Sequence, residues 1–201
     1  MKKNLFMMIA GLAAIAILAT SCAKVPQVEI DAAKAAVEAA KVAEADRYIP
    51  AEFNALQDSL NTALTIVENQ KSKFALFRSY KEAKAKLLNT TNLANTVKEN
   101  AGIRKEQVKQ EVQQKMTETT ALIEEVKTLI TKAPRGKEGK QVLDAIQSDL
   151  ALVEASVAEV TTLVNNGDYL TAQDKVTAAK TKVEGLKAEL EEAIAKKGYK
   201  K

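Results

Sequence analysis

The chain has 201 residues, with 30 Lys plus Arg, 26 Asp plus Glu, one Cys, and neither His nor Trp. The absence of His removes the commonest general base and a usual metal ligand, and a single Cys leaves no intramolecular disulfide. Aromatic residues are few, and residues 22–195 carry slightly more acidic than basic side chains, which argues against nucleic-acid binding. We therefore expect no enzyme activity, no cofactor, no metal site and no nucleic-acid partner.

Residues 1–21 have the layout of an export signal. Lys2 and Lys3 precede an apolar run over residues 5–19, and small residues then lead into Cys22. This run is shorter than the roughly 20 residues that span a bilayer, but it fits the apolar segment of a signal peptide. The alternative interpretation is an ordinary signal peptide ahead of an incidental cysteine.

This leader resembles a lipoprotein signal peptide, in which the cysteine thiol is acylated and the cysteine becomes the first residue after cleavage. The resemblance implies lipidation of Cys22 and a short lipidated tether over residues 22–27. By the same resemblance, Ala23 rather than Asp after the cysteine favours the outer membrane. We therefore expect a palmitate-type anchor in the cell outer membrane, facing the periplasm rather than the cell surface.

A first helical bundle is expected over residues 28–101. An alanine-rich helix is predicted at 28–48, because alanine is the best helix former. A hairpin of two amphipathic helices follows, and Ser79 with Glu82 predicts a capping box at the start of its second helix. The predicted apolar stripe of this hairpin is Phe53, Leu56, Leu60, Ala63, Val67, Phe74, Tyr80, Ala83, Leu87, Thr90, Ala94 and Val97.

One long helix is predicted over residues 80–132, which contain no Pro and only one Gly. At 1.5 Å per residue it would measure roughly 80 Å. Its stripe takes an eleven-residue period between Val97 and Thr119, which relaxes left-handed supercoiling. Gly102 and Lys105 are expected on this stripe and would weaken its packing, so a bend or hinge would fall at 100–106.

A second bundle is expected over residues 102–195, followed by a basic tail at 196–201. A turn at 165–168 separates its two helices, with Asp168 placed as an N-cap. Steps of three and four residues place the apolar positions on one narrow seam. The predicted seam is Leu143, Ile146, Leu150, Val153, Val157, Val160, Val164, Tyr169, Ala172, Val176, Ala179, Val183, Leu186, Leu190 and Ala193.

The two hairpins repeat each other. The stripe of the first helix recurs 90 residues later and that of the second 89 residues later, so Tyr80 and Tyr169 both open a second helix. Each tyrosine is expected to cover a bundle end with its hydroxyl in water, and a ligand-stacking role is the alternative. The predicted fold is all-α, with elongated helical hairpins in coiled-coil-like bundles and two repeats that share one long central helix.

Two further segments resemble known families. The patterns at 79–83 (Ser-Tyr-Lys-Glu-Ala) and 168–172 (Asp-Tyr-Leu-Thr-Ala) are similar to those of uncharacterised bacterial lipoproteins with alanine-rich helical-hairpin repeats, and also to tetratricopeptide-like repeats. The terminal Gly-Tyr-Lys-Lys resembles the tail of murein (Braun-type) lipoprotein, whose last lysine is joined to peptidoglycan. That resemblance implies Lys201 as an attachment point, and an ordinary frayed basic tail is the alternative.

The first functional hypothesis is a lipid-anchored cell-envelope protein that acts as a helical spacer or scaffold. The alternatives are a tetratricopeptide-like module that binds a protein or peptide in the periplasm, and a peptidoglycan tether through Lys201. The expected partners are the membrane, through the N-terminal lipid, and peptidoglycan or another envelope protein. Association of the chain with itself through the thin seams is a further option.

The acidic pairs at 124–125 and 191–192 are predicted to be surface charges, because adjacent helical residues point about 100° apart.

Overall fold

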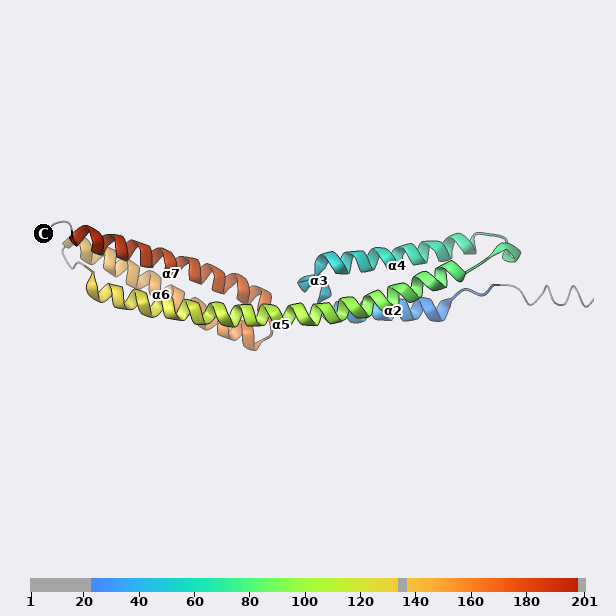
Figure 1. Ribbon diagram of the computed structural model, residues 1–201, viewed down its shortest axis with the longest axis horizontal. Helices are drawn as coiled ribbons and strands as arrows, with labels where there is room; N and C mark the ends of the chain where they lie inside the picture. Colours follow the sequence, from blue (N-terminus) through green and yellow to red (C-terminus); the bar gives the residue numbers. More distant parts are fainter. Residues whose placement is uncertain (1–22, 134–136, 199–201) are drawn as a thin grey trace, which may run out of the picture. The chain divides into compact units, whose positions relative to one another are not determined.

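The computed structural model describes residues 23–133 and 137–198 (Figure 1). These residues are largely helical and contain no strand, so the predicted all-α class is confirmed. The elements are α2 (Gln27–Val42), α3 (Ala45–Tyr48), α4 (Pro50–Lys71), the 3-10 helix η1 (Ala75–Phe77), α5 (Lys81–Lys132), α6 (Lys137–Asn165) and α7 (Tyr169–Gly198). The chain divides into two compact units between Arg104 and Lys105, inside α5. None of the described helices combines the length and apolar character that crossing a bilayer requires.

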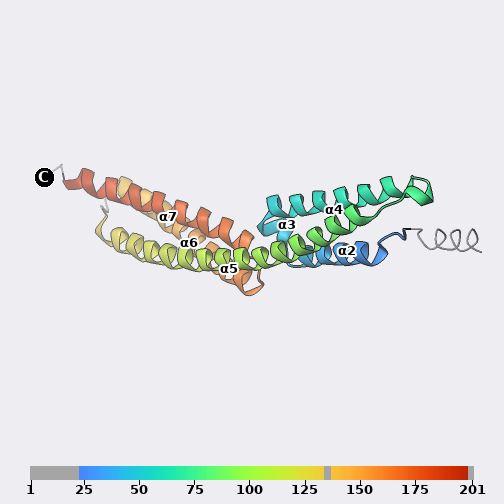
Figure 2. The same ribbon diagram turned by 45° about the vertical axis from the view of Figure 1, so that its right-hand side comes forward.

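Unit 1, which ends at Arg104, is a bundle of α2, α4 and the first part of α5, with the short α3 between α2 and α4. Two core clusters fill it, and each takes residues from all three long helices. They are Ile30, Ala33, Ala63, Val67, Tyr80, Ala83 and Leu87, and Ala40, Ala45, Phe53, Leu56, Ala94, Val97 and Ala101. Because α2 and α5 pass through the clusters in the same order and α4 in the reverse order, α2 and α5 are parallel and α4 is antiparallel (Figures 1 and 2).

Unit 2, which begins at Lys105, repeats this plan with the remainder of α5, α6 and α7. Its core residues are Ile123, Val126, Ala133, Leu143, Ile146, Leu150, Val153, Ala179, Val183, Leu186 and Leu190. Ion pairs from Lys182 to Asp149 and from Lys175 to Glu159 show that α6 and α7 run antiparallel. The single helix α5 thus supplies the last helix of one bundle and the first helix of the other.

The predicted seams are confirmed at most positions. The eleven-residue period of α5 is visible in the burial of Ala101, Val108 and Val112. Two threonines on this helix, Thr90 and Thr119, are fully buried. Their hydroxyls donate to the carbonyls four residues earlier, at 2.9 Å and 2.7 Å, so burial leaves neither hydroxyl without a hydrogen-bond acceptor.

The predicted helix at 28–48 is divided in two. Glu44 has a left-handed backbone with φ 61°, which costs roughly 1–2 kcal/mol for an L-residue other than glycine. The break turns the chain so that Ala45 and Tyr48 are buried in unit 1. The Arg47 guanidinium, 2.6 Å from the Glu44 carboxylate, closes the turn. The sequence carries no Gly or Pro at this break, so the alanine pattern alone predicts a continuous helix.

The prediction that Phe74 lies on the seam was wrong. Helix α4 ends at Lys71, and residues 72–80 form a loop that contains η1, in which the Phe74 side chain is 69% exposed. The corresponding helix of unit 2, α6, continues to Asn165. The apolar spacing thus continues for one turn beyond the true end of α4, so it predicts a helix that is one turn too long.

The predicted capping box was also wrong. Helix α5 begins at Lys81, and the Lys84 amide donates to the Tyr80 carbonyl at 2.9 Å, so Tyr80 takes the N-cap position. The backbone amide of Ser79 donates to the side-chain oxygen of Gln70 at 3.1 Å. Gln70, near the end of α4, thus accepts the bond expected at Glu82.

The turn between α6 and α7 agrees with the sequence. Gly167 has φ 79°, and its amide donates to the Val164 carbonyl at 3.1 Å. The Asp168 amide donates to the Leu163 carbonyl at 3.0 Å, which completes a Schellman motif. Because α7 starts directly after Asp168 and the Ala172 amide donates to the Asp168 carbonyl, the N-cap position of Asp168 is confirmed.

Gly102 does not lie on the seam. Its neighbour Ala101 is buried, whereas Gly102 is exposed and has open space where a Cβ would stand. Helix α5 runs unbroken from Lys81 to Lys132, so the predicted hinge region at 100–106 is helical throughout.

Candidate functional site

The two residues that the sequence singles out for modification lie outside the described part of the chain. Cys22 immediately precedes the first described residue, and Lys201 lies beyond Gly198. Lipidation at Cys22 and peptidoglycan attachment at Lys201 therefore stay predictions. The structure does describe the segment that directly follows Cys22.

This segment, residues 23–26, packs against unit 1. Ala23 and Val25 are partly buried against the cluster that contains Tyr80, and Pro26 is buried. The Gln27 amide donates to the Val25 carbonyl at 2.8 Å, which fixes the entry into α2. The residues expected to form a tether are thus part of the bundle, and residue 22 stands one position before it.

The repeat-matched tyrosines have different surroundings. Tyr80 is 3% exposed, and its hydroxyl is buried with no hydrogen-bond partner among the described residues. The expectation that this hydroxyl lies in water was wrong, because the Tyr80 side chain is buried among residues of α2, α4 and α5 at this end of unit 1. Tyr169 is partly exposed, and the Lys105 ammonium lies 6.0 Å from its ring centroid, at the distance limit of a cation–π contact.

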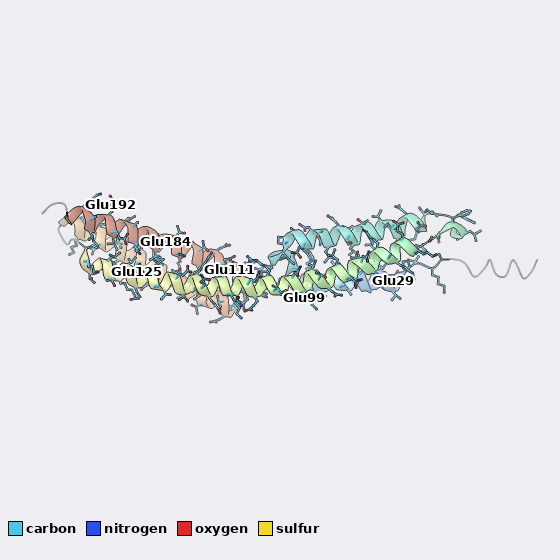
Figure 3. The ribbon with its side chains drawn as sticks, in the orientation of Figure 1. Glu29, Glu99, Glu111, Glu125, Glu184 and Glu192 are labelled. Carbon is cyan, nitrogen blue, oxygen red and sulfur yellow. The ribbon has the colours of Figure 1, made fainter. Side chains whose placement is uncertain are left out.

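A ladder of polar side chains joins α5 to α7 in unit 2. Its three carboxylates, Glu111, Glu118 and Glu125, stand seven residues apart on α5. Each accepts from the side chain 62 positions later on α7, at distances of 2.6, 2.6 and 2.7 Å. The donors are Gln173, Lys180 and Lys187. A constant offset along both helices requires them to be parallel, which agrees with the bundle (Figure 3, where Glu111, Glu125 and Glu184 mark the two helices).

The ladder shifts the titration of its members. The hydrogen bond from Lys180 is the main reason that the pKa of Glu118 lies below its ordinary value, and the same bond raises the pKa of Lys180. The hydrogen bond to Glu125 likewise raises the pKa of Lys187. The two ion pairs of the ladder remain partly exposed to solvent, where such pairs contribute little to stability, so we assign the ladder to fixing the register of α7 against α5. The ladder was not among the features predicted from the sequence, although the seven-residue spacing of its members beside both seams was an available signal.

The acidic pairs are used in ion pairs on the bundle surface. Glu124 contacts Lys127 at 2.8 Å, and Glu192 contacts Lys196 at 2.5 Å. Lys187 lies 4.0 Å from Glu191. Across residues 23–133 and 137–198, no group of three or more His, Cys, Asp or Glu residues is arranged to hold a metal ion.

Open grooves run along α7 in unit 2. One has a volume of about 840 Å³, and a smaller one between α5 and α7 has a volume of about 550 Å³. The small residues Ala178 and Gly185 are part of the wall of the larger groove, and a Cβ added at Gly185 would meet open space. At one end Lys115 donates to Thr177 at 2.9 Å. The larger groove offers exposed polar groups beside a short apolar surface, which suits weak contact with an extended chain.

The described units therefore offer a packed N-terminal segment in unit 1 and a grooved, charge-matched surface in unit 2. Their chemistry is that of hydrogen bonds, ion pairs and apolar contact. Comparison of the chain with protein-family models, curated proteins and solved structures gave no significant match.

Proposed function

We propose that this chain is a lipid-anchored cell-envelope protein that acts as a helical spacer or scaffold. The observation that carries the proposal is the position of Cys22, at the end of a lipoprotein-like leader and one residue before the packed Ala23. An acyl-modified cysteine at this position would hold unit 1 close to the membrane surface without a flexible linker. Two or more acyl chains would make that anchoring stable, since one chain binds only marginally.

The packing of both units supports a structural role. The apolar stripes of the long helices pack within their own bundles. The outer faces of the bundles carry ion-paired Lys and Glu side chains. The side-chain ladder on α5 and α7 fixes their register in unit 2. These features favour a rigid element whose chemistry lies at its attachment point.

The experiment is metabolic labelling with palmitate in cells that express the full chain. We expect label on the wild-type protein, loss of label in Cys22→Ala, and accumulation of the uncleaved form when globomycin blocks the lipoprotein signal peptidase. Ser21→Ala serves as the matched control and should retain its label. A wild-type protein without label, or equal label on Cys22→Ala, would contradict the proposal.

A second candidate function, binding of a protein or peptide in the periplasm, is favoured by the larger groove of unit 2. Gly185→Leu would fill this groove without a clash near the backbone, because open space surrounds the added Cβ. If the groove binds a partner, a protein that co-purifies with the wild-type chain from native membranes should be lost in Gly185→Leu. The matched control is Gly102→Leu, on α5 in unit 1, which should keep that partner. Equal recovery with both variants would exclude the groove.

A further inference from the structure

The loop at residues 72–80 presents three large apolar side chains to solvent. Phe74, Leu76 and Phe77 are 69%, 63% and 76% exposed. The two phenyl rings contact each other, with centroids 6.3 Å apart. Three exposed apolar side chains within four residues form a continuous patch, and such patches commonly mark an interaction surface.

Hydrogen bonds within the loop hold this patch outward. The Phe77 amide donates to the Phe74 carbonyl at 2.9 Å. The Arg78 side chain donates from Nε to the Lys73 carbonyl, also at 2.9 Å, and the Ser79 amide is held by Gln70. The exposure of the patch is therefore a consequence of an ordered loop.

Basic residues flank the patch on both sides in the sequence. Residues 71–86 contain six Lys or Arg and a single acidic residue, Glu82. Lys71 is paired with Glu68 at 2.7 Å and Lys84 with Glu29 at 2.7 Å, while Lys73 and Lys81 are exposed on either side of the apolar residues. An apolar loop flanked by exposed lysines is complementary to an anionic bilayer surface, where aromatic rings enter the interface and lysines contact phosphate groups.

The repeat supplies an internal comparison. The corresponding turn of unit 2 connects α6 to α7 in three residues, Asn166, Gly167 and Asp168, and carries no apolar side chain. It closes as a Schellman motif and serves only to reverse the chain. Connecting two antiparallel helices in this repeat therefore does not require the longer apolar and basic loop of unit 1.

The loop lies at the end of unit 1 where the chain enters α2 (Figures 1 and 2). Tyr80, its last residue, belongs to the core cluster against which Ala23 and Val25 pack. The loop and the residue that follows Cys22 are thus on the same end of one compact unit.

We infer that the loop at 72–80 is a membrane-docking element that places Phe74, Leu76 and Phe77 in the interface of a bilayer with anionic phospholipids. The inference rests on the proposed function in that the bilayer is the one expected to hold Cys22. Insertion of the loop would orient unit 1 by adding a second contact point beside the lipid.

The test uses the mature chain, residues 22–201, which contains every described residue, with Cys22→Ser to prevent acylation and disulfide formation. We expect it to co-sediment with vesicles of phosphatidylethanolamine and phosphatidylglycerol, and more weakly with vesicles of phosphatidylcholine alone.

Phe74→Ser/Phe77→Ser should reduce binding to the anionic vesicles by about tenfold or more, because both rings leave the interface. Lys73→Gln/Lys81→Gln should weaken binding and reduce its dependence on salt. Leu152→Ser, an exposed apolar position on α6, is the control and should bind like the parent.

Three outcomes would overturn the inference: no binding to anionic vesicles, equal binding by the double-serine variant, or equal binding to both vesicle types. Self-association in sedimentation that disappears in the double-serine variant, without vesicle binding, would assign the patch to a second copy of the chain instead. Because the test protein has no lipid, its result is independent of the palmitate experiment. Vesicle binding without palmitate labelling would support the docking role of the loop and contradict lipidation of Cys22. Labelling without vesicle binding would support lipidation and contradict the docking role.

Discussion

Leu87→Ala should lower the free energy of unfolding of unit 1 by about 2–5 kcal/mol, the range for leucine truncation in a packed core. The Leu87 side chain is fully buried in the cluster that contains Ile30 and Val67, so its removal leaves a cavity among three helices. Urea unfolding followed by far-ultraviolet circular dichroism would measure this as a lower midpoint. Because the two units can unfold in separate transitions, the wild type and the variant should be compared at the transition whose midpoint the substitution changes.

The adjacent residue provides the control. Leu88 has the same side chain on the same helix but is 59% exposed, so Leu88→Ala should change stability by no more than about 0.5 kcal/mol. Nearly equal losses of stability for the two variants would mean that α5 does not pack through the face that carries Leu87. A large loss for Leu88→Ala alone would contradict the seam directly.

Two substitutions of Gly102 should act in opposite directions. Gly102→Ala should raise the free energy of unfolding by roughly 0.5–1 kcal/mol, because the position is in a helix interior and a Cβ meets no atom within 4 Å. Gly102→Pro should lower it by about 3 kcal/mol or more, since proline removes an amide donor and clashes with the preceding turn. Thermal and urea unfolding would measure both effects.

Gly185, in the interior of α7, is the matched control, because a Cβ added there also meets open space. Its Ala and Pro variants should show the same pair of signs. If the Gly185 variants behave in this way while Gly102→Pro has no effect, the helix is not continuous at residue 102. That result would restore the hinge expected from the sequence at 100–106.

The helices and their buried faces could be predicted from the sequence because apolar spacing reports burial directly. Val153 and Val183 are buried where three-and-four spacing places them, and the eleven-residue period of α5 is likewise observed. Gly167 and Asp168 were informative because their residue types suit a left-handed turn and a helix start.

The errors arose where local structure depends on tertiary contacts. Glu44 breaks a helix-favouring sequence because the chain turns there to bury Tyr48, and nothing in the local residue types signals this. Phe74 fits the helical spacing, yet α4 ends before it. The Gln70 side chain replaces the expected cap at Glu82, a contact that spans nine residues between two elements. Next to Cys22, the segment expected to form a tether is packed against α2, α4 and α5, because Ala23 and Val25 find apolar partners there that local sequence does not reveal.

The boundary between the units, between Arg104 and Lys105, lies within one continuous helix. A fragment that ends at Arg104 would terminate in a helix end with four backbone carbonyls lacking their intrahelical donors. A fragment that starts at Lys105 would leave four amides without acceptors in the same way. A cut at this boundary would therefore create two new helix ends, whose free carbonyls and amides water or added capping residues would have to satisfy.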